Sequence, residues 1–519
     1  MTKRPNFLYI MVDQLRADWL GCYGHPLVKT PNIDALAAQG TRFDEFHVAS
    51  PVCMPNRASF MTGRMPSVHG LRFNGCSLPA RANTFVDVLA AAGYMTATIG
   101  KSHLQPCTDV DAETRGTDLN GPIAEAWKDD TADYTLEEPA HYGPNGGAFP
   151  KSYYGFDHVT MVNGHGDRAG GHYGQWFRET HADWKALYDP KNELPHNLSV
   201  PQARRTPIPE DSYPTAYTRD RACNYLAEQA TRDAPFFAFV SFNDPHHPFN
   251  PPGKYWDMYD PEDFDLPLRF EDHANPPPPL LDARATYEAG LGQITPQTAF
   301  MASDRHVQEA MALTAGMITM IDDAVGRIIT VLKETGQYDN TVIVFNADHG
   351  DYMGDFNMLL KGAWTTRAIN RVPMIWSDPA DRTARTSDAL ASTIDISATV
   401  LARAGLDPYF GIQGQSFLGC LTGTGEHRSS LLVEYNDGLT RMGFDAPARV
   451  RAVLTRDWQM TVYKDQPWGE LYDLRADPGQ TRNLWDDGAH GQKRAELFEI
   501  LTHHLIAQMD ESPRTTRLA

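Results

Sequence analysis

The sequence predicts an α/β protein with one large sheet between helices and a smaller sheet and helix at its C-terminus. Four short segments, residues 6–14, 95–99, 235–242 and 340–351, contain apolar runs that are rich in β-branched and aromatic residues. Uninterrupted apolar runs of this length are typical of buried parallel strands. A fifth segment, residues 304–334, repeats its apolar side chains with helical spacing and predicts a long helix packed on that sheet.

The shorter elements follow from local signals. Residues 31–40 have Asn and Asp near their start and a glycine at their end, which predicts a helix. The run from Arg57 to Met61 suggests a helix that opens at Cys53. Residues 105–234 are rich in Gly, Asp, Tyr and His, and include the sequence Gly-His-Gly-Asp at 164–167. We interpret this region as an insertion that shapes the mouth of a pocket.

The C-terminal part of the chain has a different pattern. Residues 250–298 contain four consecutive prolines, a poor match to regular structure, and we interpret them as a loop or an intersubunit arm of a homo-oligomer. Residues 430–434, 449–454 and 459–463 predict a small antiparallel sheet, closed by a helix over 492–509. We therefore divide the chain into a catalytic α/β domain, residues 1–425, and a C-terminal α+β subdomain, residues 426–519.

Composition excludes several classes of function. A net charge of −20 over 519 residues argues against a nucleic-acid partner, which requires a basic surface. No apolar stretch approaches the ~20 residues that span a bilayer, and the run from Phe7 to Val12 is too short for the apolar core of a signal peptide. The six cysteines lie far apart, unlike a disulfide framework. We expect a cytoplasmic protein with no membrane partner.

Chemically active side chains follow all four predicted strands. Because parallel sheets bind ligands at the edge where their strands end, we expect these side chains to converge. They are Asp13 after the first strand, Lys101 and His103 after the second, His246 after the third, and Asp348 with His349 after the fourth.

A cysteine motif joins this set. Cys53, Pro55, Arg57, Thr62 and Gly63 form C-x-P-x-R-x4-T-G. This motif resembles the signature of the sulfatases, and the resemblance extends over residues 6–370, with a C-terminal signature at 470–474. It implies the alkaline phosphatase-like fold and hydrolysis of sulfate monoesters of the arylsulfatase type. In that family a maturation enzyme oxidises the cysteine to formylglycine, whose hydrate is the nucleophile, and the arginine holds it in place.

The resemblance also implies a divalent metal ion, bound by Asp13, Asp348, His349 and an oxygen of the modified Cys53. Most calcium sulfatases carry an aspartate where this chain has Gln14 and an asparagine where it has His349. Phosphonate monoester hydrolases, which are related, share the pairs found here. Since imidazole favours manganese and carboxylate or amide oxygens suit calcium, both Ca²⁺ and Mn²⁺ remain open.

The remaining roles are carried over position by position. Lys101 corresponds to a sulfate clamp and His103 to the base that breaks the covalent intermediate. His246 and Lys361 correspond to groups that bind the ester oxygens and protonate the leaving alcohol, a transfer that suits histidine. The separation of Asn74 from Cys53 matches an asparagine that contacts substrate in the phosphonate hydrolases. We interpret the neighbouring residue, His247, as a loop or supporting residue.

Three readings of function remain. The first is hydrolysis of a small anionic sulfate ester. The second is hydrolysis of phosphonate monoesters or phosphodiesters by the same nucleophile, and the third is a metal-binding protein in which Cys53 stays a thiol. Lys101 and His103 favour the first, because phosphonate hydrolases of the related group carry neutral hydroxyl residues at these two positions.

Overall fold

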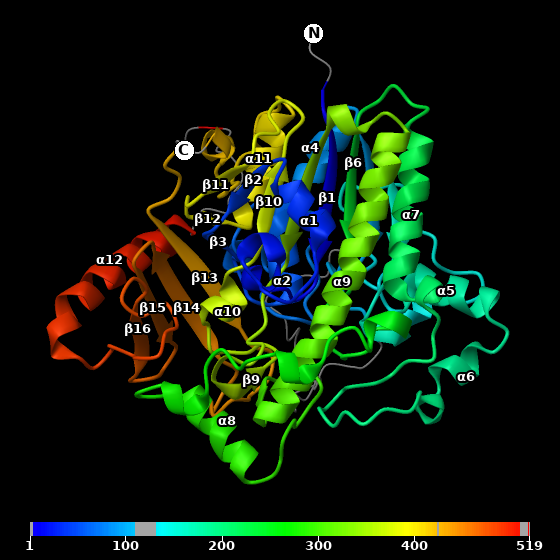
Figure 1. Ribbon diagram of the computed structural model, residues 1–519. Coiled ribbons are helices and arrows are strands. Elements are labelled where there is room, and N and C mark those ends of the chain that lie inside the picture. The colour runs from blue at the N-terminus through cyan, green and yellow to red at the C-terminus, as the bar shows by residue number, and fades with distance from the viewer. Residues whose placement is uncertain (1–3, 109–130, 423–424, 509–516, 518–519) are drawn as a thin grey trace, which may run out of the picture.

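The computed structural model describes residues 4–108, 131–422, 425–508 and 517. An eight-stranded sheet forms its centre (Figure 1). The strands of this sheet are β1 (Asn6–Val12), β2 (Thr41–Phe43), β4 (Met95–Gly100), β5 (His158–Met161), β6 (Phe236–Ser241), β8 (Thr341–Ala347), β10 (Met374–Ser377) and β11 (Arg385–Ser387).

The spatial order of the strands is β11-β2-β10-β8-β1-β6-β4-β5. From β8 to β5 all neighbours are parallel, whereas β10 runs antiparallel to both β8 and β2, so the sheet is mixed. All four predicted strands are confirmed, and they are β1, β4, β6 and β8. Every residue of β1 is buried, because both faces of the sheet are covered. Two-stranded pairs outside the sheet join β3 (Phe46–His47) to β12 (Ala391–Ser392) and β7 (Phe300–Met301) to β9 (Met358–Leu359).

Two groups of helices cover the sheet. In Figure 1, α7 (Pro214–Gln229) and α9 (Asp304–Glu334) lie side by side, and α1 (Pro31–Ala37) packs on α9. The bounds predicted for the long helix are confirmed. The second group comprises α2 (Cys53–Thr62), α4 (Phe85–Ala91) and α11 (Ile394–Arg403), which pack on one another. The remaining helices are α3 (Pro66–His69), α5 (Gly171–Thr180), α6 (Trp184–Tyr188), α8 (Pro278–Glu288), α10 (Arg367–Asn370) and α12 (Gly491–Ala507).

The C-terminal sheet is antiparallel, as predicted. Its strands follow chain order, β13 (Ser430–Asn436), β14 (Arg449–Thr455), β15 (Trp458–Tyr463) and β16 (Gly469–Asp473), and α12 packs on them. Sequence analysis missed β16. The amide of Glu434 in β13 donates to the carbonyl of Ala49, 2.9 Å away, which ties this sheet to the segment just before Cys53. The boundary after residue 425 stays a prediction.

Two interpretations need correction. Residues 250–298 are not only a loop or arm: the proline run opens α8, because proline is tolerated in the first turn of a helix. This segment packs on its own chain, with the Ala274 amide donating to the Thr481 carbonyl at 2.8 Å. Residues 105–234 are more than a pocket mouth, since they supply the edge strand β5 and the helix α7. Part of that region, 109–130, lies outside the described residues.

Candidate active site

Cys53 is the first residue of α2, a helix in which every residue is buried. One turn later, the guanidinium of Arg57 donates to Asp348 Oδ2 at 2.8 Å and to the Lys101 carbonyl at 3.0 Å. The motif's glycine, Gly63, ends the helix with φ of +63°, and a Cβ there would lie 2.3 Å from Ser397 Oγ. Only glycine fits both restrictions. The motif therefore fixes Cys53 and Arg57 on one rigid helix.

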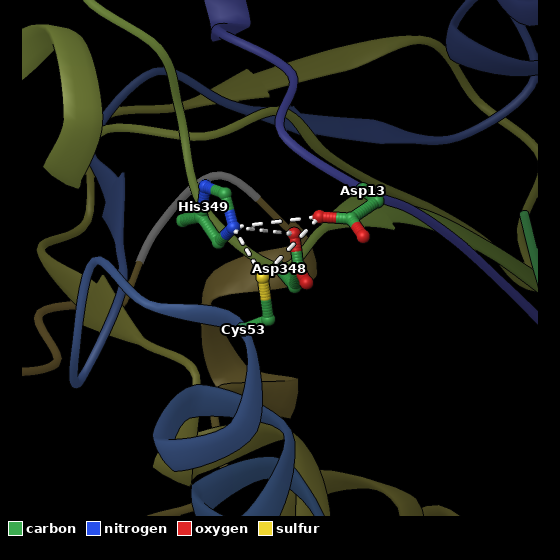
Figure 2. Close-up of side chains that lie close together, drawn as sticks. All are labelled: Asp13, Cys53, Asp348 and His349. Carbon is green, nitrogen blue, oxygen red and sulfur yellow. Dashed lines mark hydrogen bonds and ion pairs between the residues drawn. The ribbon is translucent and has the colours of Figure 1, made fainter. Parts of the chain in front are cut away.

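Four buried side chains meet at the end of the sheet. Figure 2 shows Asp13, Cys53, Asp348 and His349 pointing toward one another, and one ligand atom from each lies within 4.8 Å of all the others. The Cys53 sulfur lies 3.1 Å from His349 Nε2. Because His349 Nδ1 is engaged with the Gly350 carbonyl at 2.8 Å, Nε2 is left facing the two carboxylates. Asp13 and Asp348 follow adjacent parallel strands, β1 and β8, as the sequence predicted.

The charges of this cluster favour a cation. Burial opposes the charged form of Asp13, but the Lys101 ammonium holds the pKa of this carboxyl well below its usual value. Burial and the Asp13 carboxylate raise the pKa of Asp348. Although burial acts against it, Asp348 raises the pKa of His349 to about 9. Two buried carboxylates repel each other unless positive charge lies between them, so this oxygen and nitrogen donor set fits a divalent ion.

Two lysine ammonium groups also lie near Cys53. The Lys101 ammonium contacts Asp13 and lies 2.6 Å from His165 Nε2. The Lys361 ammonium lies 2.5 Å from Gln14 Oε1 and 3.0 Å from His246 Nε2. Although burial and Asp13 oppose ionisation, these cations lower the pKa of the Cys53 thiol well below its usual value. Such a concentration of buried positive charge suits an anionic ester in an otherwise acidic protein.

His103 is buried in a loop whose shape is set by Glu137. The Glu137 carboxylate accepts the amides of His103, Leu104 and Gln105 at 2.9, 2.9 and 3.1 Å. Burial and the Lys101 ammonium lower the pKa of the His103 imidazole to about 3, while Cys53 acts in the opposite direction. The ring is therefore uncharged at neutral pH. Sequence reasoning did not identify Glu137.

Asn74 is also close to the motif. Its side-chain oxygen accepts the amide of Met54 at 3.2 Å, so it binds the first turn of α2. The amides at the start of this helix are therefore not all free to attract an anion, because Asn74 engages one of them. Asn74 is itself exposed to solvent.

Sequence reasoning placed His165 at the pocket mouth but missed its contacts in the site. Its ring stacks on that of His246, with ring centres 3.6 Å apart, and its Nε2 lies 3.4 Å from Asp13 Oδ2. The Gly-His-Gly-Asp sequence was the one available signal. His247 is a supporting residue, as expected, since its Nδ1 lies 3.1 Å from the Gln14 side-chain nitrogen.

Comparison with known proteins agrees with this geometry. Residues 5–406 match the family described as Sulfatase. The chain belongs to the sulfatase family. As a sulfatase it is a sulfuric ester hydrolase, and its large mixed sheet with a small C-terminal sheet is the alkaline phosphatase-like fold. Residues 363–508 also match the family described as N-sulphoglucosamine sulphohydrolase, C-terminal.

Relatives of this sulfatase have different names. It is 27% identical to an arylsulfatase of Clostridium perfringens, over 97% of this chain and 94% of the relative. It is 23% identical to an N-acetylglucosamine-6-O-sulfatase of Bacteroides thetaiotaomicron, over 99% and 88%. The solved structure of the phosphonate monoester hydrolase of Agrobacterium radiobacter covers 99% of this chain and 100% of its own, with 24% identity and a TM-score of 0.75. That last likeness concerns the fold alone.

Among the described residues, no helix combines the length and the apolar character needed to cross a membrane.

Proposed function

We propose that this sulfatase hydrolyses sulfate monoesters of the aryl type, with Cys53 oxidised to formylglycine as the nucleophile. The observation that carries the proposal is the position of Cys53: its sulfur lies 3.1 Å from His349, on a helix fixed by Arg57, between a carboxylate pair and two lysines. Formylglycine supplies a hydrated aldehyde, which has one hydroxyl to attack sulfur and a second whose deprotonation expels sulfate.

We propose that Asp13, Asp348 and His349 hold one divalent ion, Ca²⁺ or Mn²⁺, together with the modified Cys53. Such an ion would stabilise negative charge on the nucleophile and on the ester oxygens. Arg57 supports the site by pairing with Asp348 from the helix below. The Lys101 and Lys361 ammonium groups then hold the remaining sulfate oxygens, as preorganised charges that water does not screen.

Two histidines move protons in this proposal. His246 Nδ1 lies 2.5 Å from the His247 carbonyl, so this nitrogen must donate. In the neutral ring Nε2 is therefore an acceptor, and it faces the Lys361 ammonium at 3.0 Å. The Lys361 and His246 pair can pass a proton to the leaving alcohol. The neutral His103 acts as the base that releases sulfate.

Hydrolysis of phosphonate monoesters and phosphodiesters is the second candidate. Gln14 and His349 match the residues of those enzymes, and Asn74 lies beside Cys53 as their asparagine would. Lys101 favours sulfate, because it is a buried fixed cation that contacts Asp13. His103 favours it too, since a neutral base is in place.

A matched series of 4-nitrophenyl sulfate, phenylphosphonate and phosphodiester separates the two candidates. We expect kcat/KM to be highest for the sulfate, and Lys101→Ala and His103→Ala each to lower sulfate turnover by roughly 10²-fold or more. A clear preference of the unmodified enzyme for the phosphonate or the diester would favour the second candidate.

The remaining proposals concern partners and place. A formylglycine-generating enzyme must act on Cys53 before the chain assumes its final activity. All six cysteines are free thiols, which supports a reducing compartment, and we propose the cytoplasm. A homo-oligomer is compatible with these features and would be seen by analytical ultracentrifugation.

A further inference from the structure

A pocket of about 460 Å³, within the ~300–1,000 Å³ typical of small-molecule sites, is lined by none of the residues assigned to the site. Three parts of the chain enclose it: α8, residues 292–301 and residues 438–442. No role assigned above uses it. The apolar part of its wall includes Ala283, Ile294, Phe300, Met301, Leu439 and Met442.

Met442 connects this pocket to the site. Its sulfur accepts the Ala363 amide at 3.4 Å, and a Cβ on Gly362 would lie only 2.4 Å from it. Met442 in the pocket wall therefore packs directly against the backbone of Gly362 and Ala363, which follow Lys361. Met442 also belongs to one packed apolar cluster with Val52, the residue before Cys53.

A second contact joins the pocket to the opposite edge of the site. Gly438 packs so closely on the ring of Phe73 that an added Cβ would lie 3.1 Å from a ring carbon. Phe73 precedes Asn74, which binds the amide of Met54. Met442 and Gly438 thus bring the pocket wall into contact with the residues that adjoin Lys361 and Asn74.

The charges in the pocket exclude one class of substrate. Among the described residues that line it, Arg441 is the one base, and the Asp437 carboxylate neutralises it at 2.6 Å. Asp282 adds a negative charge to the same wall. A second sulfate or a carboxylate on the substrate would meet no free positive charge there. The other polar lining groups are hydroxyls, from Thr286, Thr295, Thr298 and Thr440.

We propose that this pocket binds the alcohol portion of the sulfate ester, and that the substrate is the sulfate monoester of an uncharged, largely apolar alcohol. This inference rests on the proposed sulfate hydrolysis. The leaving oxygen lies at Lys361 and His246, and the carbon skeleton passes Gly362 and fills the space beside Met442. Burial of apolar area provides affinity that is lost when the alcohol leaves.

Two pocket variants test the proposal. Ile294 and Leu439 line the pocket with exposed fractions of 67% and 48%, so Ile294→Asp and Leu439→Asp leave the fold intact. With 2-naphthyl sulfate we expect each variant to raise KM about tenfold, because a charge enters an apolar pocket, and to change kcat by less than about twofold. The matched control is Leu281→Asp, on α8 and 49% exposed but outside the pocket, which should leave both constants unchanged.

A binding measurement separates this inference from the proposed function. The Cys53→Ala variant lacks the nucleophile, and we expect it to bind 2-naphthol, followed by the fluorescence of that alcohol. Adding Leu439→Asp should weaken this binding about tenfold. The pocket assignment is overturned if Leu439→Asp leaves the affinity for 2-naphthol unchanged. It is also overturned if KM is unchanged in both pocket variants. Failure of the matured enzyme to cleave any sulfate ester overturns the proposed function, while naphthol binding still decides whether the pocket takes an apolar alcohol.

A charged substrate gives a further check. Glucosamine 2-N,6-O-disulfate carries a second sulfate, for which the pocket offers no free cation. We expect its kcat/KM to lie at least tenfold below that of 2-naphthyl sulfate, because its second sulfate would lose water in the pocket without gaining a cation as partner. A preference for the disulfate would overturn the inference.

Discussion

At the scale of single residues, the cysteine motif combines two requirements, a reactive position and a rigid one. Cys53 starts a helix that is buried throughout, and Arg57 anchors that helix to Asp348. The thiol lies among cations that already lower its pKa. The same cations would favour the ionised form of a hydrated aldehyde at this position. Chemistry at Cys53 is therefore the first property to test.

We expect Cys53→Ala to remove nearly all sulfatase activity, because no nucleophile remains. Cys53→Ser should allow at most one slow turnover, since its single hydroxyl can attack sulfur but offers no second hydroxyl to expel sulfate. Intact mass, peptide mapping of residue 53 and a burst assay measure these outcomes. Fully active enzyme in which residue 53 remains entirely thiol would contradict the formylglycine assignment.

His165 is the residue at the site whose contacts sequence reasoning could not identify. Its ring stacks on His246 and lies 2.6 Å from the Lys101 ammonium. We expect His165→Ala to lower kcat by about 10- to 100-fold by releasing both neighbours, with metal content unchanged. A matched control is His158→Ala, an exposed histidine of the same region.

Metal analysis of His165→Ala distinguishes two roles for this histidine. Asp13, His165 and His246 form a second group whose ligand atoms lie within 4.8 Å of one another. The contact of Lys101 with Asp13 already brings a cation to that position, so we assign His165 to substrate positioning. Loss of bound metal in the variant would instead make His165 a ligand.

At the scale of elements, prediction from the sequence was most accurate where one hydrophobic pattern runs through the whole element. The bounds of α9 are those predicted, because this helix has one continuous apolar face, and β1 lies within the predicted segment, because it is buried on both faces. Prediction was poorer for strands β2, β10 and β11, which have only three or four residues. Strand β16 was recognised as a family signature but not as a strand. Helix α8 was missed because its prolines looked like a break.

The residues of the candidate site also divide into those that the sequence could predict and those that it could not. Asp13, Lys101, Asp348 and His349 could be predicted, because each follows a strand and parallel strands end together. His165 could not, since its loop is brought to the site by tertiary packing between β5 and α5. A lone histidine between glycines has no characteristic sequence spacing from the other residues of the site.

Helix α3 gives a prediction about pH. His69 is buried, accepts the Leu71 amide at Nδ1, 3.2 Å away, and lies 3.0 Å from Ser59 Oγ of α2. Burial lowers the pKa of His69 to about 3, below the ~6.5 of an unfolded chain. The unfolded state then binds more protons than the folded state. Stability contributed by His69 is complete above about pH 6.5 and is lost as pH falls toward 3.

Between pH 7.5 and pH 5 this loss amounts to about 2 kcal/mol. We expect His69→Gln to show a pH dependence of the free energy of unfolding that is smaller by about this amount, measured by urea unfolding at both pH values. The exposed His503 provides the control, and His503→Gln should keep the wild-type dependence. An unchanged dependence in His69→Gln would contradict the assignment.

At the scale of the whole molecule, the site joins segments that are distant in the chain. Asp13 follows β1, Cys53 opens α2, and Asp348 follows β8, so the cluster links the N-terminal strand, a helix and a strand more than 300 residues away. The two carboxylates cannot both be charged at no cost while they lie together in a buried place. A bound cation would remove that repulsion and hold the three segments in register.

This linkage predicts that metal stabilises the fold. A ligand that binds only the folded state at about 100 times its Kd adds about 2.7 kcal/mol. We therefore expect a chelator to lower the Tm of the wild type by a few degrees, with about one divalent ion per chain lost, and added metal to restore it. Asp348→Ala should contain little metal, but it also removes the ion-pair partner of the buried Arg57.

His349→Gln is the sharper variant for this test, because it removes one metal ligand without stranding Arg57. We expect it to bind little metal and to show no Tm response to chelator. His247→Gln, in the adjacent loop but outside the donor group, should respond as the wild type does. A variant at His349 that retains a full metal complement and the wild-type chelator response would show that the ion binds elsewhere. The cluster at the end of β1 and β8 would then be a buried ion-pair network that stabilises the sheet without a metal.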